Sequence, residues 1–299
     1  MKILLTGSSG RIGRAIFARL SGAHEVIGLD RAPFSTTHII GDCADAEILK
    51  SALYGVDAVI HTAGPHAPHV GTLADAEFER VNVDGTALLY ELALASGATR
   101  FLYTSTTALY GHAIRAGECA WIDEVTAPQP KSIYHRTKLA AETLLEELAT
   151  PQLTVRVLRM SRCFPERADR MASYRLHRGI DARDVASGHG LALNSMGCDS
   201  PAFDRFILSG ATPFAQEDCA ALAQEPRAVI KRCAPALLDA MDQRGWPIPV
   251  TIDRVYSSAK AQSELGWTPR WGWEEVLAQA DRHDLEVLPA GLQTLLRPE

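Results

Sequence analysis

The chain has 299 residues, a formal net charge of −6, 46% hydrophobic residues and 22% charged residues, which is typical of a globular protein with a sizeable core. It has no run of 18 apolar residues and no long basic segment, so the sequence excludes a membrane-spanning helix and argues against nucleic acid or a membrane surface as a partner. Its first residues lack the layout of a signal peptide, and we expect a cytoplasmic protein whose six scattered cysteines are reduced and hold no metal.

The first 160 residues alternate short apolar runs with longer helical patterns. Strands are predicted over 2–5, 25–29, 58–61, 100–104 and 154–158. Helices are predicted over 11–20, 45–53, 72–96 and 134–149. This alternation predicts an α/β fold of the Rossmann type, a doubly wound parallel sheet with helices on both faces. In such a sheet the ligand binds beyond the carboxyl ends of the strands.

The pattern becomes irregular after about residue 160. We predict an arginine-rich loop over 164–182, a helix over 183–194 and a strand over 203–208. The rest indicates short helices interrupted by prolines, and the tail, 285–299, has no strong pattern.

These patterns divide the chain into two parts. We expect a dinucleotide-binding domain over 1–160, to which 183–208 returns. A small substrate-binding lobe is expected from 161–182 and 209–299.

A glycine-rich turn follows the first strand and opens the first helix: Thr6-Gly7-Ser8-Ser9-Gly10-Arg11-Ile12-Gly13. Gly7 can form the tight turn, Gly10 lets the backbone approach a pyrophosphate, and Gly13 allows the helix to pack closely on the strand. Backbone N–H groups at the helix start then face the anion. We therefore predict that the three glycines, with Ser9, Arg11 and Ile12, bind a dinucleotide.

Two acidic residues bear on the choice of dinucleotide: Asp30, at the end of the second strand, and Asp42, which follows a short third strand. A carboxylate at Asp30 can accept hydrogen bonds from the adenosine ribose and repel a 2′-phosphate, which favours NAD over NADP. Arg31 could instead pair with such a phosphate. Asp42 could meet the adenine amine, or could cap the helix that starts near residue 45.

Tyr134 and Lys138 lie four residues apart at the start of a predicted helix, so they share one face. A free tyrosine, with a pKa of about 10, is a poor base at neutral pH. A nearby ammonium favours the phenolate. Tyr134 can then take a proton from a substrate hydroxyl. Lys138 would also hold the nicotinamide ribose.

A third catalytic group is expected where the predicted strand over 100–104 ends, in the segment Thr104-Ser105-Thr106-Thr107. One of these hydroxyls can hydrogen-bond the reacting oxygen and steady it against Tyr134. The alternative for each is ordinary turn chemistry.

Together these features resemble the extended short-chain dehydrogenase/reductases, the NAD-dependent epimerase/dehydratase family. The resemblance rests on the glycine turn, His61-Thr62-Ala63-Gly64, Asn82-Val83-Asp84-Gly85-Thr86, Leu109-Tyr110-Gly111, the Tyr134–Lys138 motif, Arg183-Asp184-Val185-Ala186 and Glu264-Leu265-Gly266-Trp267-Thr268-Pro269. It implies that Thr106 is the catalytic hydroxyl, with Ser105 beside it at the substrate. It also implies a cofactor contact at Ala63 and a homodimer.

The segment after Arg159 is shorter than in family members that use nucleotide sugars, and it resembles that of uronate dehydrogenases. That resemblance implies that Arg170 binds a sugar carboxylate, because a guanidinium group can donate two parallel hydrogen bonds to a carboxylate. The alternative is that Arg170 belongs to a solvated basic loop. His66 could donate to a sugar hydroxyl, or it could be an exposed loop histidine.

The leading hypothesis is an NAD-dependent oxidoreductase that acts on a sugar or sugar-like alcohol. One rival is a nucleotide-sugar epimerase or dehydratase that returns the hydride to its substrate. The other is a dinucleotide-binding sensor without catalysis.

Overall fold

The computed structural model describes residues 1–197 and 200–290. Cys198 and the tail from 291 onward lie outside the described residues. No helix within the described ranges is long and apolar enough to cross a bilayer.

A seven-stranded parallel sheet organises the fold, with the order β3-β2-β1-β4-β5-β7-β8. Its strands are β1 (Lys2–Thr6), β2 (Glu25–Asp30), β3 (Ile39–Ile40), β4 (Ala58–His61), β5 (Arg100–Thr106), β7 (Thr154–Met160) and β8 (Phe203–Leu208). The chain runs outward from β1 in both directions, so the order reverses between β1 and β4. This confirms the predicted Rossmann-type doubly wound sheet.

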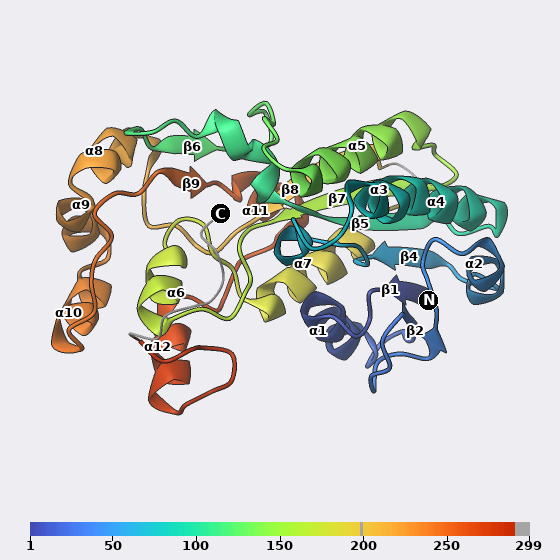
Figure 1. Cartoon of the computed structure of the whole chain (residues 1–299), viewed down its shortest axis with the longest axis horizontal. Helices are drawn as coiled ribbons and strands as arrows, with labels where there is room; N and C mark the ends of the chain where they lie inside the picture. Colours follow the sequence, from blue (N-terminus) through green and yellow to red (C-terminus); the bar gives the residue numbers. More distant parts are fainter. Residues whose placement is uncertain (198–199, 291–299) are drawn as a thin grey trace.

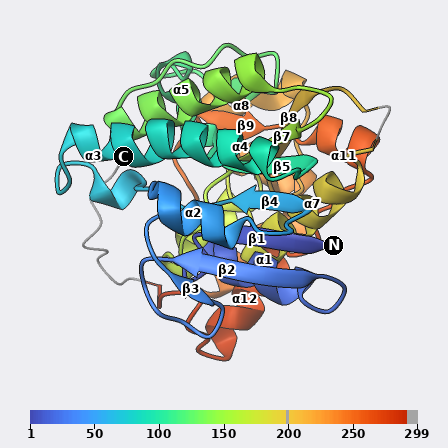
Figure 2. The ribbon, with the colours of Figure 1, turned by 90° about the vertical axis from the view of Figure 1, so that its right-hand side faces the viewer.

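Helices cover both faces of the sheet (Figures 1 and 2). One face packs against α2 (Ala46–Ala52), α4 (Gly85–Ala95) and α5 (Ile133–Leu148). The other face packs against α1 (Arg11–Leu20), α7 (Ala182–Asn194) and α11 (Ala259–Leu265). The strands are apolar on both faces because each face is covered.

The predicted helix over 72–96 is present but begins later and is not regular. It consists of α3 (Asp75–Glu79), a π-helical turn over Arg80–Asp84, and α4. The π turn contains the buried Asn82, whose side chain donates to the Pro65 carbonyl at 3.1 Å and the Thr137 hydroxyl at 3.0 Å. Asn82 thereby ties this helix both to the loop after β4 and to α5.

A third apolar cluster lies beside the sheet, at the left of Figure 1. It is built from α6 (Ala168–Tyr174), α8 (Cys219–Gln224), α9 (Pro226–Cys233), α10 (Pro235–Gln243) and α12 (Trp273–Asp281). Pro226 and Pro235 are each the first residue of a helix, where a missing N–H costs no hydrogen bond.

Two features of this region differ from the prediction. The segment predicted as a loop over 164–182 contains α6, whose Ala168, Met171 and Ala172 are buried in the third cluster. Tertiary burial, rather than local pattern, stabilises this short helix. In addition, β6 (Ala120–Ile122) pairs in parallel with β9 (Arg254–Tyr256), which sequence patterns did not reveal because the two segments lie far apart along the chain.

Candidate active site

The glycine turn has the backbone geometry that its sequence predicts. Gly7 has φ of +74°, and a Cβ there would lie 2.5 Å from the Thr62 hydroxyl. A Cβ on Gly13 would lie 2.0 Å from the Gly7 carbonyl oxygen. Gly10 is the N-cap residue of α1 and provides no side-chain cap, so the first N–H groups of this helix are available to an anion.

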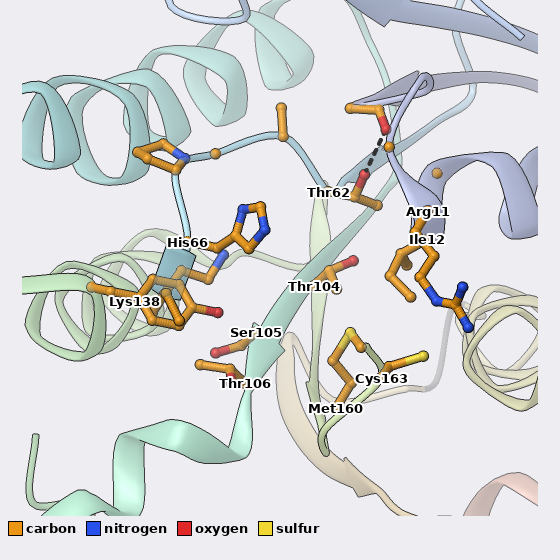
Figure 3. A pocket seen from close by; sticks show the side chains of 18 of the residues that line it. Arg11, Ile12, Thr62, His66, Thr104, Ser105, Thr106, Lys138, Met160 and Cys163 are labelled. Atoms are coloured by element: carbon orange, nitrogen blue, oxygen red, sulfur yellow. Dashed lines mark hydrogen bonds between the residues drawn. The ribbon is translucent and has the colours of Figure 1, made fainter. Parts of the chain in front are cut away.

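A cavity of about 780 Å³ runs across the carboxyl ends of the strands. The glycine turn lines it together with Ser9, Arg11, Ile12, Asp30 and Ala63, all of which the sequence predicts to contact the cofactor. Figure 3 shows Arg11 and Ile12 on one side and Lys138, Ser105 and Thr106 on the other. The cavity therefore joins the predicted cofactor turn to the predicted catalytic residues.

Asp30 lies at the end of β2 beside the glycine turn. Its carboxylate accepts hydrogen bonds from the backbone N–H of Ser9 at 2.9 Å and of Ala32 at 3.0 Å. Two backbone donors fix this charge at the mouth of the cavity, where an adenosine ribose is expected.

Arg31 and Asp42 are engaged with each other. Arg31 donates to Asp42 at 2.7 Å and to Glu77 at 3.1 Å, and Arg80 also donates to Asp42 at 2.7 Å. Arg31 lines the cavity, whereas Asp42 is not among its lining residues. The capping alternative for Asp42 is wrong, because Asp45 caps α2 by accepting from the Glu47 and Ile48 N–H groups. A 2′-phosphate would have to compete with two carboxylates for Arg31.

Tyr134, Lys138 and Thr106 line the same cavity. Tyr134 and Lys138 lie in the first turns of α5, which Ser132 caps by accepting from the His135 N–H. Thr106 ends β5, and its hydroxyl accepts from the Ala108 N–H at 3.1 Å, which leaves its hydrogen available for donation into the cavity.

Lys138 is almost completely buried, with its Nζ 3.9 Å from the centroid of the Tyr103 ring. Burial lowers the pKa of Lys138 to about 7, an effect that the carboxylate of Glu142 opposes. The amine therefore changes protonation state near neutral pH, beside the phenol that it is expected to activate.

Two of the other predicted hydroxyls have buried partners. Thr104 pairs with His189 at 2.8 Å, and Ser105 donates to Glu142. Ser105 lines the cavity, but this hydrogen bond commits its proton to Glu142 and competes with the predicted substrate contact. Thr106 therefore suits a substrate better than Thr104 or Ser105 does, and Thr107 also lines the cavity.

Glu142 and Arg159 form a buried ion pair that the sequence analysis missed. Arg159 donates from Nε to Oε2 at 3.0 Å and from Nη2 to the same oxygen at 2.6 Å, and it also donates to the Tyr110 hydroxyl at 2.8 Å. Glu142 is one turn beyond Lys138 on α5, so the spacing Tyr134, Lys138, Glu142 could have revealed it.

The substrate end of the cavity differs in part from the prediction. His66 lines it, and its ring stacks on Phe164 at 5.9 Å between centroids. Arg170 does not line it: this side chain is 42% exposed and lies 3.9 Å from Glu166. The arginines that do line the cavity include Arg162, Arg178 and Arg254. Arg254 comes from β9, a strand that the sequence patterns did not reveal.

No group of three histidine, cysteine or acidic side chains is placed to hold a metal ion within residues 1–197 and 200–290. His66 and His69, two histidines three residues apart, pack edge to face at 4.6 Å between centroids.

The parallel sheet, the glycine turn and the cavity across the strand ends define a dinucleotide-binding fold of the Rossmann type. Residues 3–195 match the NAD dependent epimerase/dehydratase family, and the chain belongs to that family. Its cofactor is NAD.

Several known proteins are similar to this chain. The NAD-dependent glucose-6-phosphate dehydrogenase of Haloferax volcanii is 32% identical over 168 residues, which cover 48% of this chain and 60% of that enzyme. The dTDP-glucose 4,6-dehydratase of Streptomyces antibioticus is 27% identical over 93% of this chain and 91% of its own length. A solved short-chain dehydrogenase/reductase superfamily protein of Agrobacterium tumefaciens with bound NAD has a TM-score of 0.69 and 22% identity, and the match covers 94% of this chain and 96% of that one.

The buried Lys138 generates a prediction about stability and pH. Its native pKa of about 7 lies below the ordinary 10.5, so between these values the unfolded chain binds more protons than the native protein. The free energy of unfolding contributed by this residue therefore rises with pH across that window. We expect Lys138→Met to abolish this rise between pH 7 and 9 in cofactor-free protein, as measured by urea denaturation. The exposed Lys131→Met is the control and should follow the wild type; identical profiles for all three proteins would contradict the prediction.

The fixed carboxylate of Asp30 generates a prediction about cofactor selectivity. Asp30→Asn retains an acceptor oxygen for the turn but removes the charge. We expect the affinity for NADH, relative to that for NADPH, to fall by roughly 10- to 100-fold. The variant loses a charged acceptor for the ribose hydroxyls of NADH, and it no longer repels the 2′-phosphate of NADPH. Fluorescence titration with each reduced cofactor measures this ratio without any substrate. An unchanged ratio would show that Asp30 does not face the ribose.

Proposed function

We propose that this protein is an NAD-dependent dehydrogenase of a sugar or sugar-like alcohol. The observation that carries the proposal is the shared cavity: Tyr134, Lys138 and Thr106 line it at one end and the glycine turn lines it at the other. Family membership supports hydride chemistry with NAD.

The side chains divide the work at the reacting carbon. Thr106 donates a hydrogen bond to the substrate oxygen and holds it in place. Tyr134 takes the proton from that oxygen, and Lys138 stabilises the resulting phenolate. NAD, held at the glycine turn, would supply the acceptor for the hydride of the same carbon. The buried Glu142–Arg159 pair holds α5 against β7, and so keeps Tyr134 and Lys138 at the strand ends.

A nucleotide-sugar dehydratase or epimerase is the second candidate. The similarity to the dTDP-glucose 4,6-dehydratase over nearly the whole chain favours it. The short segment between Arg159 and Arg183, which contains only the seven-residue α6 as a helix, favours a smaller substrate. Incubation with NAD and a panel of free sugars, uronates and nucleotide sugars separates the two. A dehydrogenase accumulates reduced cofactor, whereas the second candidate converts a nucleotide sugar without accumulating it.

Tyr134→Phe tests the proposed chemistry directly. Removal of the proton acceptor should lower kcat by roughly 10²- to 10⁴-fold, while the dissociation constant for NADH stays within a few-fold of the wild type. Tyr54→Phe, at a tyrosine that is 84% exposed, is the matched control and should retain full rate. A Tyr134→Phe protein that keeps its rate would refute the mechanism. A wild-type protein that binds NADH but converts no compound of the panel would favour the alternative of a dinucleotide-binding sensor without catalysis.

A further inference from the structure

One part of the cavity lining is formed by basic side chains. Arg162, Arg178 and Arg254 belong to it, and each side chain is only about a fifth exposed. The two acidic lining residues, Asp30 and Glu77, belong to the region near β2 instead. Guanidinium groups that are largely removed from water need negative charge beside them.

The backbone holds these arginines in fixed positions. The N–H of Arg162 donates to the Arg178 carbonyl at 3.0 Å, so these two residues lie on adjacent, hydrogen-bonded segments. His177 contacts the Arg254 carbonyl at 2.9 Å through Nδ1, and the Tyr256 N–H donates to the His177 carbonyl at 2.9 Å. These contacts dock β9 beside residue 178. Three segments far apart in sequence thus form one wall.

Among the described residues, the three guanidinium groups of this wall contact fewer carboxylates than would neutralise them. Arg162 is matched by Glu166, which accepts from it at 2.9 and 2.7 Å. Arg254 donates to both oxygens of Asp253, at 2.9 and 2.6 Å, while Arg178 approaches the same carboxylate only to 3.8 Å. Arg178 and Arg254 therefore share one negative charge between two positive charges.

The wall also lies close to the catalytic turn. Tyr256, two residues after Arg254 on β9, lines the cavity and donates from its hydroxyl to the Thr107 carbonyl at 3.3 Å. Thr107 is the residue after Thr106. A substrate whose reacting oxygen lies at Thr106 can thus extend toward Arg178 and Arg254.

We propose that Arg178 and Arg254 form an anion subsite that holds a carboxylate or phosphate group of the substrate. This inference rests on the proposed function, because it assigns the far end of the same substrate. It replaces Arg170, which lies outside the cavity, as the group that recognises a sugar anion. A guanidinium group whose charge is not fully neutralised by a carboxylate can donate two parallel hydrogen bonds to a carboxylate or a phosphate of the substrate.

The test measures binding to the NADH complex of the full chain, so that no turnover is needed. Calorimetric titrations use glucose, glucuronate, glucose 6-phosphate and UDP-glucose as probes. We expect at least one of the three anionic probes to bind tenfold or more tightly than glucose. The probe that binds most tightly identifies the anion: glucuronate stands for a carboxylate, glucose 6-phosphate for a phosphate monoester, and UDP-glucose for a nucleotide diphosphate. Arg254→Met and Arg178→Met should each weaken that probe by about 10- to 100-fold and leave glucose unchanged.

Asp253→Asn is the complementary variant. It removes the carboxylate that competes for both arginines, so it should tighten anion binding several-fold. Opposite effects of Arg254→Met and Asp253→Asn cannot arise from general misfolding. Equal affinity for glucose and all three anions, or a loss of anion affinity in Arg170→Met but not in Arg178→Met or Arg254→Met, would overturn the subsite.

The subsite and the proposed function can fail separately. Anion binding that depends on these arginines, without NAD reduction by any probe or sugar, would leave the subsite standing and refute the dehydrogenase. NAD reduction by a neutral sugar, with no dependence on Arg178 or Arg254, would leave the dehydrogenase standing and refute the subsite.

Discussion

A positive charge buried inside the protein, at Lys138, is the feature on which the rest of the site depends. Its ammonium packs on the face of Tyr103 and lies one helical turn after Tyr134. A buried ammonium loses hydration, which is why its pKa falls to about 7. The electron-rich face of Tyr103 and the carboxylate of Glu142 partly compensate for that loss. Because the pKa of this amine lies near neutral pH, a small change in charge beside it, such as ionisation of Tyr134, changes the fraction that is protonated.

Glu142 links this amine to the scaffold. It would be a costly buried charge by itself, but Arg159 binds both of its oxygens and Ser105 donates to it. Arg159 lies on β7 and Ser105 on β5, so one carboxylate connects α5 to two neighbouring strands of the sheet. The position of Tyr134 and Lys138 relative to Thr106 is therefore set by a buried network and not by a flexible loop. Such support is what a proton transfer over hydrogen-bond distance requires.

The sequence predicted the sheet well because its strands and covering helices obey local periodicity. The first helix and the strand at Phe203–Leu208 have the predicted bounds, and Gly7 and Gly13 are required by contacts that a Cβ would violate. Prediction failed where long-range packing decides. The helix α6 has only seven residues and forms because Ala168 and Met171 are buried against distant segments. The β6–β9 pair has only three residues in each strand, too few to produce a pattern.

Sequence motifs located the catalytic side chains but not the charges around the substrate. Motifs report residues that are adjacent along the chain, whereas Arg178 and Arg254 meet only because β9 docks against residue 177. Arg170 matched a motif, yet it does not line the cavity.

The balance of charge differs between the cofactor region of the cavity and the region around Arg178 and Arg254. At the cofactor end, Arg11 pairs with Glu286 and Arg31 with two carboxylates, so the helix N–H groups are left to hold a pyrophosphate. Around Arg178 and Arg254, the single carboxylate of Asp253 serves two guanidinium groups, and both arginines line the cavity. The net charge of the whole chain is −6, so most of the surface repels anions. A local excess of positive charge attracts them. Under the proposed function, charge more than shape would therefore decide which substrate binds at this site.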